Sequence, residues 1–348
     1  MRFFLHADHG DLIKGWVVPD NPVAISRVCV SIEGRRVAEV PATLTDDNIR
    51  QLGWHSTGQC HFEIRDEQVP GLAGIERLEI FDVDTNILVH RRVPDRGLVP
   101  DKVVLVNTGI LPETALQSAL FPHFRLNYFG IGRFPEEVLR VLFDTATMTS
   151  CLLSGAIAFP RYEAHFVQGE TLSMMLIHDP FVEMATRLIW LRDRSAIAAD
   201  PAQGWRLGPL ADAAGFAAEY DLADPKSLKR LFRMMPESAY HLLYNPLTRQ
   251  LGTRMPEDRL DPGNSIIAVE ILARLGLVGH RDYFDAFATT VFDRLGITAG
   301  LPVPTPIQTE VLVLADRLRE LRIAQDMVNF DTVISDGVRA SVAKNWGA

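Results

Sequence analysis

Hydrophobic and polar positions alternate with a period of two through the N-terminal part of the chain, which is the pattern of half-buried β-strands. Val28 to Ile32 alternates in this way, Glu33 to Arg35 supplies a turn, and Val37 to Val40 begins a return strand. Leu78 to Ile80 and Ile87 to Val89 have the same layout. Such paired runs predict β-hairpins, and the whole region predicts an all-β sandwich of about seven short strands.

The pattern changes near residue 100, where a stretch rich in proline and charge predicts a linker. We expect a β-sandwich accessory domain over residues 1–95, a linker over 96–101 and a second domain over 102–348. The core of the first domain is predicted to contain Trp16, Val28, Val30, Phe62 and Ile80.

Beyond the linker the apolar positions recur with the helical period of 3.6. The segment from Phe181 to Leu188 is one example, and Asp179 precedes it as the expected N-cap. Few runs in this part predict strands, the clearest being Val103 to Val106 and Leu172 to Ile177. The second domain is therefore predicted to be α/β, with a small and mostly parallel sheet surrounded by many helices.

Composition narrows the class of protein without assigning a function. The net charge of −9 argues against a nucleic-acid partner, and no apolar run is long enough for a membrane span. Three cysteines give no disulfide framework, which favours a cytoplasmic protein. His6 and His9 have the spacing of a metal-binding pair, but no third ligand is in register, so we predict no metal site.

The segment from Lys102 to Leu120 has the layout of a phosphate-binding loop, namely a buried strand, a tight connection and a helix. It resembles the loop of the glycan sulfotransferases that holds the 5′-phosphosulfate end of 3′-phosphoadenosine-5′-phosphosulfate. Aligning the two on Ser118 to Leu120 puts Ile110 at the family's lysine and Glu113 at its glycine.

Four later segments resemble sulfotransferase motifs and occur in the family's order. They are residues 178–186, 245–252, 278–285 and 326–330. The resemblance thus extends over roughly residues 102–335, and it implies a P-loop-like sulfotransferase fold. The preceding β-region is similar to the small β-domains that accompany bacterial glycosyltransferases.

The resemblance also implies which residues would contact the cofactor. They are Thr114, Ala115, His178, Thr186 and Arg249. Thr186 keeps a hydroxyl that the family uses for the 3′-phosphate. His178 stands in place of an arginine of the family. We interpret His178 as a solvent-facing loop residue that is mostly neutral at pH 7. Thr186 is equally well explained as a helical threonine bonded to its own backbone, and Arg249 as one half of a structural ion pair.

The chemistry of sulfuryl transfer argues against this cofactor. Ile110 cannot neutralise the phosphosulfate, and Glu113 would repel it by roughly 4 kcal/mol at ~4 Å. Ala156 stands where the family often has a catalytic histidine, so no catalytic residue is assigned. Replacing Glu113 with Gly and Ile110 with Lys is predicted to strengthen cofactor binding.

Three hypotheses follow. The first is a sulfotransferase that transfers sulfate to a bacterial glycan in polysaccharide biosynthesis. The second is an inactive pseudo-sulfotransferase that binds a glycan or a glycan-biosynthesis enzyme, which the substituted loop favours. The third is a transferase of the same fold that uses another donor. The acceptor and the oligomeric state are not predicted.

Overall fold

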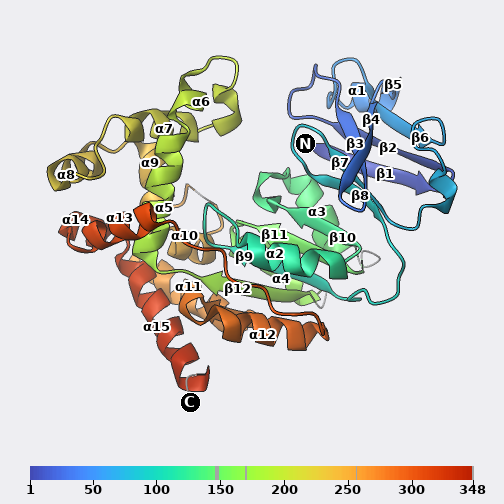
Figure 1. Ribbon diagram of the computed structural model, residues 1–348. Coiled ribbons are helices and arrows are strands. Elements are labelled where there is room, and N and C mark those ends of the chain that lie inside the picture. Colours follow the sequence, from blue (N-terminus) through green and yellow to red (C-terminus); the bar gives the residue numbers. More distant parts are fainter. Residues whose placement is uncertain (146–148, 169–170, 256, 347–348) are drawn as a thin grey trace. The chain divides into compact units, whose positions relative to one another are not determined.

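The computed structural model describes residues 1–145, 149–168, 171–255 and 257–346 (Figure 1). The chain divides into two compact units. One consists of residues 1–103 and 120–154, and the other of residues 104–119 and 155–348. The predicted linker at residues 96–101 stays a prediction.

The N-terminal strands of the first unit form two four-stranded antiparallel sheets, drawn in blue in Figure 1. One has the order β1-β2-β6-β5 and the other the order β4-β3-β7-β8. The elements are β1 (Arg2–Asp8), β2 (Leu12–Val18), β3 (Arg27–Ile32), β4 (Arg35–Pro41), β5 (Leu44–Thr45), α1 (Asp47–Gln51), β6 (Gln59–Arg65), the 3₁₀ turn η1 (Leu72–Gly74), β7 (Leu78–Asp82) and β8 (Leu88–Arg92).

The predicted hairpin is confirmed between β3 and β4. Ile32 pairs with Arg35, so Glu33 and Gly34 alone form the turn. Both have positive φ, 50° and 76°, which is the requirement of a type I′ turn between twisted strands.

The predicted core of this region is also confirmed, with one difference. Val28, Val30, Phe62 and Ile80 are each at most 1% exposed. Trp16 is half-buried instead, because it lies on the opposite face of β2 from the core residues Ile13 and Val17.

The first unit also contains η2 (Phe121–His123), β10 (Leu126–Phe129), η3 (Ile131–Arg133), α3 (Glu136–Asp144) and β11 (Cys151–Gly155). The buried ammonium group of Lys102 donates hydrogen bonds of 2.9 to 3.0 Å to three carbonyl oxygens at the end of α3. Because the last carbonyls of a helix have no partner within it, this lysine satisfies the C-terminus of α3.

A third, five-stranded sheet has the order β10-β11-β9-β12-β13, with β10 parallel to β11 and β12 parallel to β13. The remaining strands and the helices are β9 (Lys102–Asn107), α2 (Thr114–Leu120), α4 (Phe159–Gln168), β12 (Leu172–Ile177), α5 (Pro180–Asp193), α6 (Ser195–Ala199), η4 (Gly204–Leu207), α7 (Leu210–Ala218), α8 (Pro225–Met234), α9 (Glu237–Leu243), α10 (Pro246–Gly252), α11 (Pro262–Arg274), β13 (Leu277–His280), η5 (Arg281–Tyr283), α12 (Phe284–Leu295), α13 (Thr309–Arg319), α14 (Arg322–Met327) and α15 (Asn329–Trp346). The predicted strands at 103–106 and 172–177 are therefore both present, and β9 is the central strand of its sheet.

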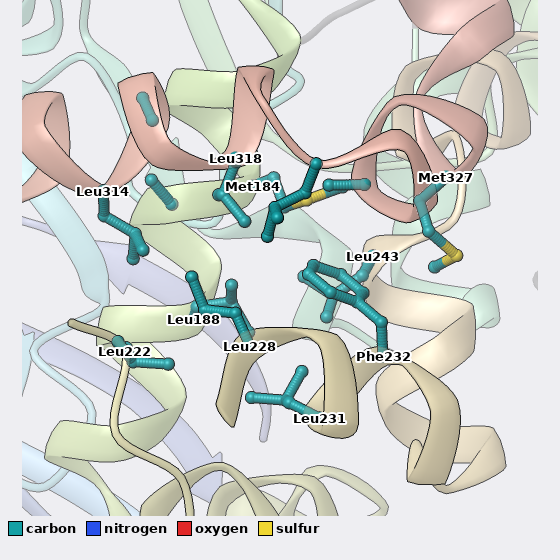
Figure 2. Packing of buried hydrophobic residues seen from close by; sticks show 14 of the residues in the cluster. Met184, Leu188, Leu222, Leu228, Leu231, Phe232, Leu243, Leu314, Leu318 and Met327 are labelled. Atoms are coloured by element: carbon teal, nitrogen blue, oxygen red, sulfur yellow. The ribbon is translucent and has the colours of Figure 1, made fainter. Parts of the chain in front are cut away.

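The helical core of the second unit is built around α5, which lies next to α7, α9 and α13 (Figure 1). Asp179 caps α5 by accepting hydrogen bonds from the backbone N–H groups of Phe181 and Val182, as predicted. Met184 and Leu188 of α5 are both 1% exposed and pack in one cluster with residues of α8, α9, α13 and α14 (Figure 2). This apolar packing fixes the position of α5 and of the polar residues that α5 carries.

Among the described residues, no helix has the length and apolarity to cross a lipid bilayer.

Candidate functional site

The loop that resembles the phosphate-binding loop connects β9 to α2, and both predicted elements are present. Its neighbour in the sheet is β12, which ends at Ile177 and is followed directly by His178. In open α/β sheets, ligands bind beyond the carboxyl ends of the strands, where neighbouring connections run in opposite directions. The order β10-β11-β9-β12-β13 places this loop at such a position.

The carboxylate of Glu183, on α5, occupies the inner side of the loop. It accepts a hydrogen bond of 3.2 Å from the backbone N–H of Ile110. Arg187, one helical turn further along α5, donates to the same carboxylate at 2.7 Å and to the carbonyl oxygen of Thr108 at 2.7 Å. The side chains of Glu183 and Arg187 are 10% and 9% exposed, so a buried ion pair binds the backbone of the loop.

A second carboxylate, that of Glu113, closes the end of the loop next to α2. It lies 3.2 Å from the guanidinium group of Arg281 and accepts a hydrogen bond of 3.0 Å from the backbone N–H of Thr305. The Thr305 hydroxyl in turn accepts from the N–H of Ala115 at 3.3 Å and lies 3.3 Å from the hydroxyl of Thr114. The first-turn groups of α2 therefore contact the proline-spaced segment that carries Thr305.

The shape of the loop also differs from a phosphate cradle. Between Asn107 and Thr114, a segment that the structure describes throughout, no residue has a positive φ. Anion-binding nests alternate right- and left-handed residues so that successive N–H groups converge. The backbone between these two residues therefore does not form an anion nest.

His178 lines two small cavities beside the loop, each with a volume of about 10 Å³. A cavity of this size has room for about one water molecule. His178 is half-buried, so our interpretation of it as a solvent-facing residue is wrong. Burial lowers the pKa of its imidazole and outweighs the opposite effect of Glu183 and Glu113, so His178 is neutral at pH 7 and offers no charge to a phosphate.

Residues 245–252, the second of the four later segments that resemble sulfotransferase motifs, form hydrogen bonds that connect α10 to α15. Asn245 is fully buried, adopts a φ of 43°, and accepts hydrogen bonds from the N–H groups of Phe330 and Asp331. Asp331 accepts in return from the N–H groups of Leu247 and Thr248 and from the Thr248 hydroxyl, at 2.7 to 2.9 Å. These residues thus hold the C-terminal helix in place.

The other two predicted cofactor contacts make bonds within the protein. The Thr186 hydroxyl donates to the carbonyl oxygen of Val182 at 2.8 Å, which is the backbone bond considered as its alternative explanation. Arg249 is 8% exposed and donates to the carbonyl oxygen of Asp258 at 2.7 Å. Neither contact requires a ligand.

These residues do not fit 3′-phosphoadenosine-5′-phosphosulfate. The N–H of Ile110 is already bound to a carboxylate, and the nearest cations, Arg187 and Arg281, are paired with Glu183 and Glu113. Each of the two cavities beside the loop has room for about one water molecule and is lined by one carboxylate, Glu183 in one and Glu113 in the other, so a phosphosulfate group does not fit there.

Sequence reasoning missed Glu183, Arg281 and Thr305. Glu113 is paired with Arg281, and Glu183 is the carboxylate that binds the backbone of the loop. The signal was present in part, because Glu183 lies in the motif-like segment 178–186. Its separation from Ile110 by 73 positions left no local pattern that would join them.

No metal-binding cluster of three or more histidine, cysteine or acidic side chains occurs among the described residues. No protein-family profile matches the chain, and no curated protein sequence is significantly similar to it.

Proposed function

We propose that the protein is a sulfotransferase-like scaffold that does not use the phosphosulfate cofactor and serves to bind a glycan or an enzyme of polysaccharide biosynthesis. One observation carries this proposal, namely the bond between the Ile110 N–H and the Glu183 carboxylate at the place of the cofactor's phosphate. Since that carboxylate belongs to the chain, an incoming anion would have to displace it and leave Arg187 unpaired.

Three further observations support the proposed fold and setting. The strand order supports the proposed fold, because ligands of doubly wound sheets bind beyond the carboxyl ends of strands in the position of β9 and β12. Two antiparallel sheets precede this sheet in the chain, as expected for a β-sandwich accessory domain. All three cysteines are buried and unpaired, which suits a reducing cytoplasm.

The direct test is whether adenosine 3′,5′-bisphosphate binds to the protein. Binding is measured as an increase in the temperature of thermal unfolding. A ligand at 100 times its Kd stabilises a protein by about 2.7 kcal/mol, a plainly visible shift. We expect no shift at ~0.1 mM bisphosphate, with an active sulfotransferase measured in parallel as the positive control. Binding at micromolar concentration, or turnover of the phosphosulfate donor, would contradict the proposal.

The structure changes the substitutions needed to restore binding. Replacing Ile110 with Lys and Glu113 with Gly leaves the Glu183 carboxylate on the loop and deprives Arg281 of its partner. We therefore expect this double variant to remain unable to bind the bisphosphate. Adding Glu183→Gln removes the remaining negative charge, so a gain of binding is expected only in the triple variant.

A further inference from the structure

The solvent-facing side of the sheet β1-β2-β6-β5 carries an unusual row of rings. Phe4 on β1 pairs with Trp16 on β2, and Trp16 pairs with His61 on β6. His61 in turn pairs with Leu44 on β5. Directly paired residues lie on the same face of a sheet, so these four side chains form one continuous row across all four strands.

Two more rings extend this row. The indole of Trp54, from the connection before β6, lies 6.0 Å from that of Trp16 between ring centroids. The imidazole of His6 is stacked on that of His61 at 5.1 Å with an interplanar angle of 24°. Phe4 and Trp16 are themselves 6.5 Å apart at 29°. We call these five rings, Phe4, His6, Trp16, Trp54 and His61, the aromatic face.

The aromatic face lies opposite the main buried side of its own sheet. The alternate residues Ile13, Phe62 and Ile64 of the same strands are at most 1% exposed and form the buried side. Phe4, by contrast, is 53% exposed and Trp16 is half-buried. Exposing neighbouring large rings to water is unfavourable, and contiguous patches of this kind mark binding surfaces.

The face is nevertheless held in a fixed arrangement. Trp16 and Trp54 pack over a small cluster of buried residues formed by Val18, Ile49 and Cys60. The guanidinium carbon of Arg2 lies 5.0 Å from the centroid of the Trp54 ring. A rigid ring loses little conformational entropy when a ligand stacks on it, so this arrangement suits binding.

Polar groups surround the rings, and their charges nearly balance, since Arg2, Lys14 and Arg65 accompany the carboxylates of Asp46 and Glu63 and Arg65 is paired with Glu63 at 2.8 Å. Lys14 and Glu63 are directly paired on β2 and β6, next to the row. The imidazole of His61 lies 2.8 Å from the carboxylate of Asp46, and Arg2 supplies a further positive charge. Burial and the neighbouring His61 lower the pKa of His6, so this ring is neutral at pH 7.

The balance of charge decides between ligand classes. A polyanion or an acidic lipid surface requires a strong excess of positive charge, which this face lacks because Glu63 and Asp46 offset two of its three cations. A purely apolar partner would remove water from Lys14 and Arg2 without supplying hydrogen-bond acceptors. A neutral sugar can contact both the rings and the polar groups around them, because one side of a hexopyranose ring presents C–H groups and its rim presents hydroxyl groups.

We propose that the aromatic face binds a neutral hexopyranose segment of a glycan, with Phe4, Trp16 and Trp54 stacking on successive sugar rings and the surrounding polar groups binding their hydroxyls. This inference rests on the proposed glycan-binding function and gives it a location in the first unit. It involves no residue of the loop that follows β9.

The test is saturation-transfer NMR with the full-length protein and three neutral hexasaccharides, cellohexaose, chitohexaose and maltohexaose. We expect saturation of the ring C–H protons of at least one of them. Phe4→Ala should weaken its binding by roughly threefold to tenfold, the range of an aromatic contact. Val37→Ala is the matched control, because Val37 is a similarly exposed strand residue (49%) on β4 of the other sheet.

Circular dichroism checks that each variant is folded, and His6→Ala repeats the test should Phe4→Ala not fold. No transfer to any of the neutral sugars overturns the proposal, as does unchanged binding by both Phe4→Ala and His6→Ala. Binding of a heparin hexasaccharide alone would also overturn it, since that ligand is anionic. None of these results depends on bisphosphate binding. Failure of the aromatic-face proposal can therefore be distinguished from failure of the proposal that the cofactor does not bind.

Discussion

At the scale of single residues, Arg187 connects the loop after β9 to its surroundings. Its guanidinium group donates to Glu183, to the carbonyl oxygen of Thr108 and, at 2.9 Å, to that of Leu242. Glu183 and Thr108 are buried and Leu242 is half-buried, so a group here that loses its bond is poorly compensated by water. The loop, α5 and α9 are therefore joined through one side chain.

Replacing Arg187 with Gln should destabilise the second unit by ~3–5 kcal/mol, because the buried Glu183 carboxylate loses its counter-ion. The measurement is urea unfolding followed by circular dichroism. Arg140→Gln is the matched control, since Arg140 forms the same kind of Glu–Arg pair one helical turn apart but is 62% exposed. That control should change stability by about 0.5 kcal/mol or less. Equal effects of the two substitutions would show that burial does not increase the contribution of the Arg187–Glu183 pair to stability.

The residue scale also shows where sequence reasoning stopped. The doubt about the cofactor followed from Ile110 and Glu113 alone, which stand where the sulfotransferases that the loop resembles have lysine and glycine. The bond between Glu183 and the Ile110 N–H could not be predicted, because a side chain that binds a distant backbone N–H leaves no periodicity in the sequence. Thr305 was missed for the same reason.

At the scale of elements, one residue in the turn of the β3–β4 hairpin adopts an unfavourable backbone conformation. Glu33 occupies the first position of a type I′ turn with a φ of 50°, a left-handed conformation that costs most residues about 1–2 kcal/mol. Asparagine adopts this conformation readily, and Asn-Gly is the preferred sequence for such a turn.

Glu33→Asn is therefore expected to stabilise the first unit by ~0.5–1 kcal/mol. The change is measured as a higher urea midpoint with an unchanged slope. Glu67→Asn serves as the control, because Glu67 is also an exposed turn residue but has no positive φ. A midpoint that falls with Glu33→Asn, or rises equally with Glu67→Asn, would contradict this explanation.

Two of the five strands of the third sheet were predicted from apolar runs, and three were not. The segments 103–106 and 172–177 were predicted as strands and form β9 and β12. Strands β10, β11 and β13 were missed, since they have only four or five residues each and a short apolar run does not distinguish a strand from a helix. The run Leu126–Phe129 becomes a strand only because β11 lies beside it to pair with it.

At the scale of the whole molecule, the hydrogen bonds that connect α10 to α15 make stability depend on pH. Burial raises the pKa of Asp331 from 3.8 to about 6, despite three hydrogen bonds that favour the ionised form. Between these two values the folded chain binds more protons at this carboxyl group than the unfolded chain does. The contribution of Asp331 to stability therefore falls as the pH rises from about 4 to about 6.

Asp331→Asn should remove this dependence. The free energy of unfolding of the wild type, minus that of the variant, should decrease with rising pH by up to ~1.4 kcal/mol per pH unit within that window. Unfolding in urea at half-unit steps of pH measures this difference, and other titrating groups cancel in it. A difference that is constant or increases across the window would show that the folded pKa is not raised.

The coarse architecture was predictable from the chain, because the change from a period of two to a period of 3.6 near residue 100 separates β-rich from helical segments. The composition of the two compact units was not. Residues 120–154 are grouped with the N-terminal strands and residues 104–119 with the C-terminal helices. Such grouping depends on contacts between segments distant in sequence, which local patterns do not encode.

The carboxylate of Glu183 on the loop has a consequence for the protein in the cell. An enzyme that binds a nucleotide gains stability from it, so its folded fraction rises and falls with the supply of that metabolite. Here the carboxylate bound to the loop is part of the chain and is present at the same effective concentration whenever the chain folds. On the proposed function, in which the loop binds no phosphosulfate cofactor, we expect the abundance of this protein to be independent of sulfur metabolism.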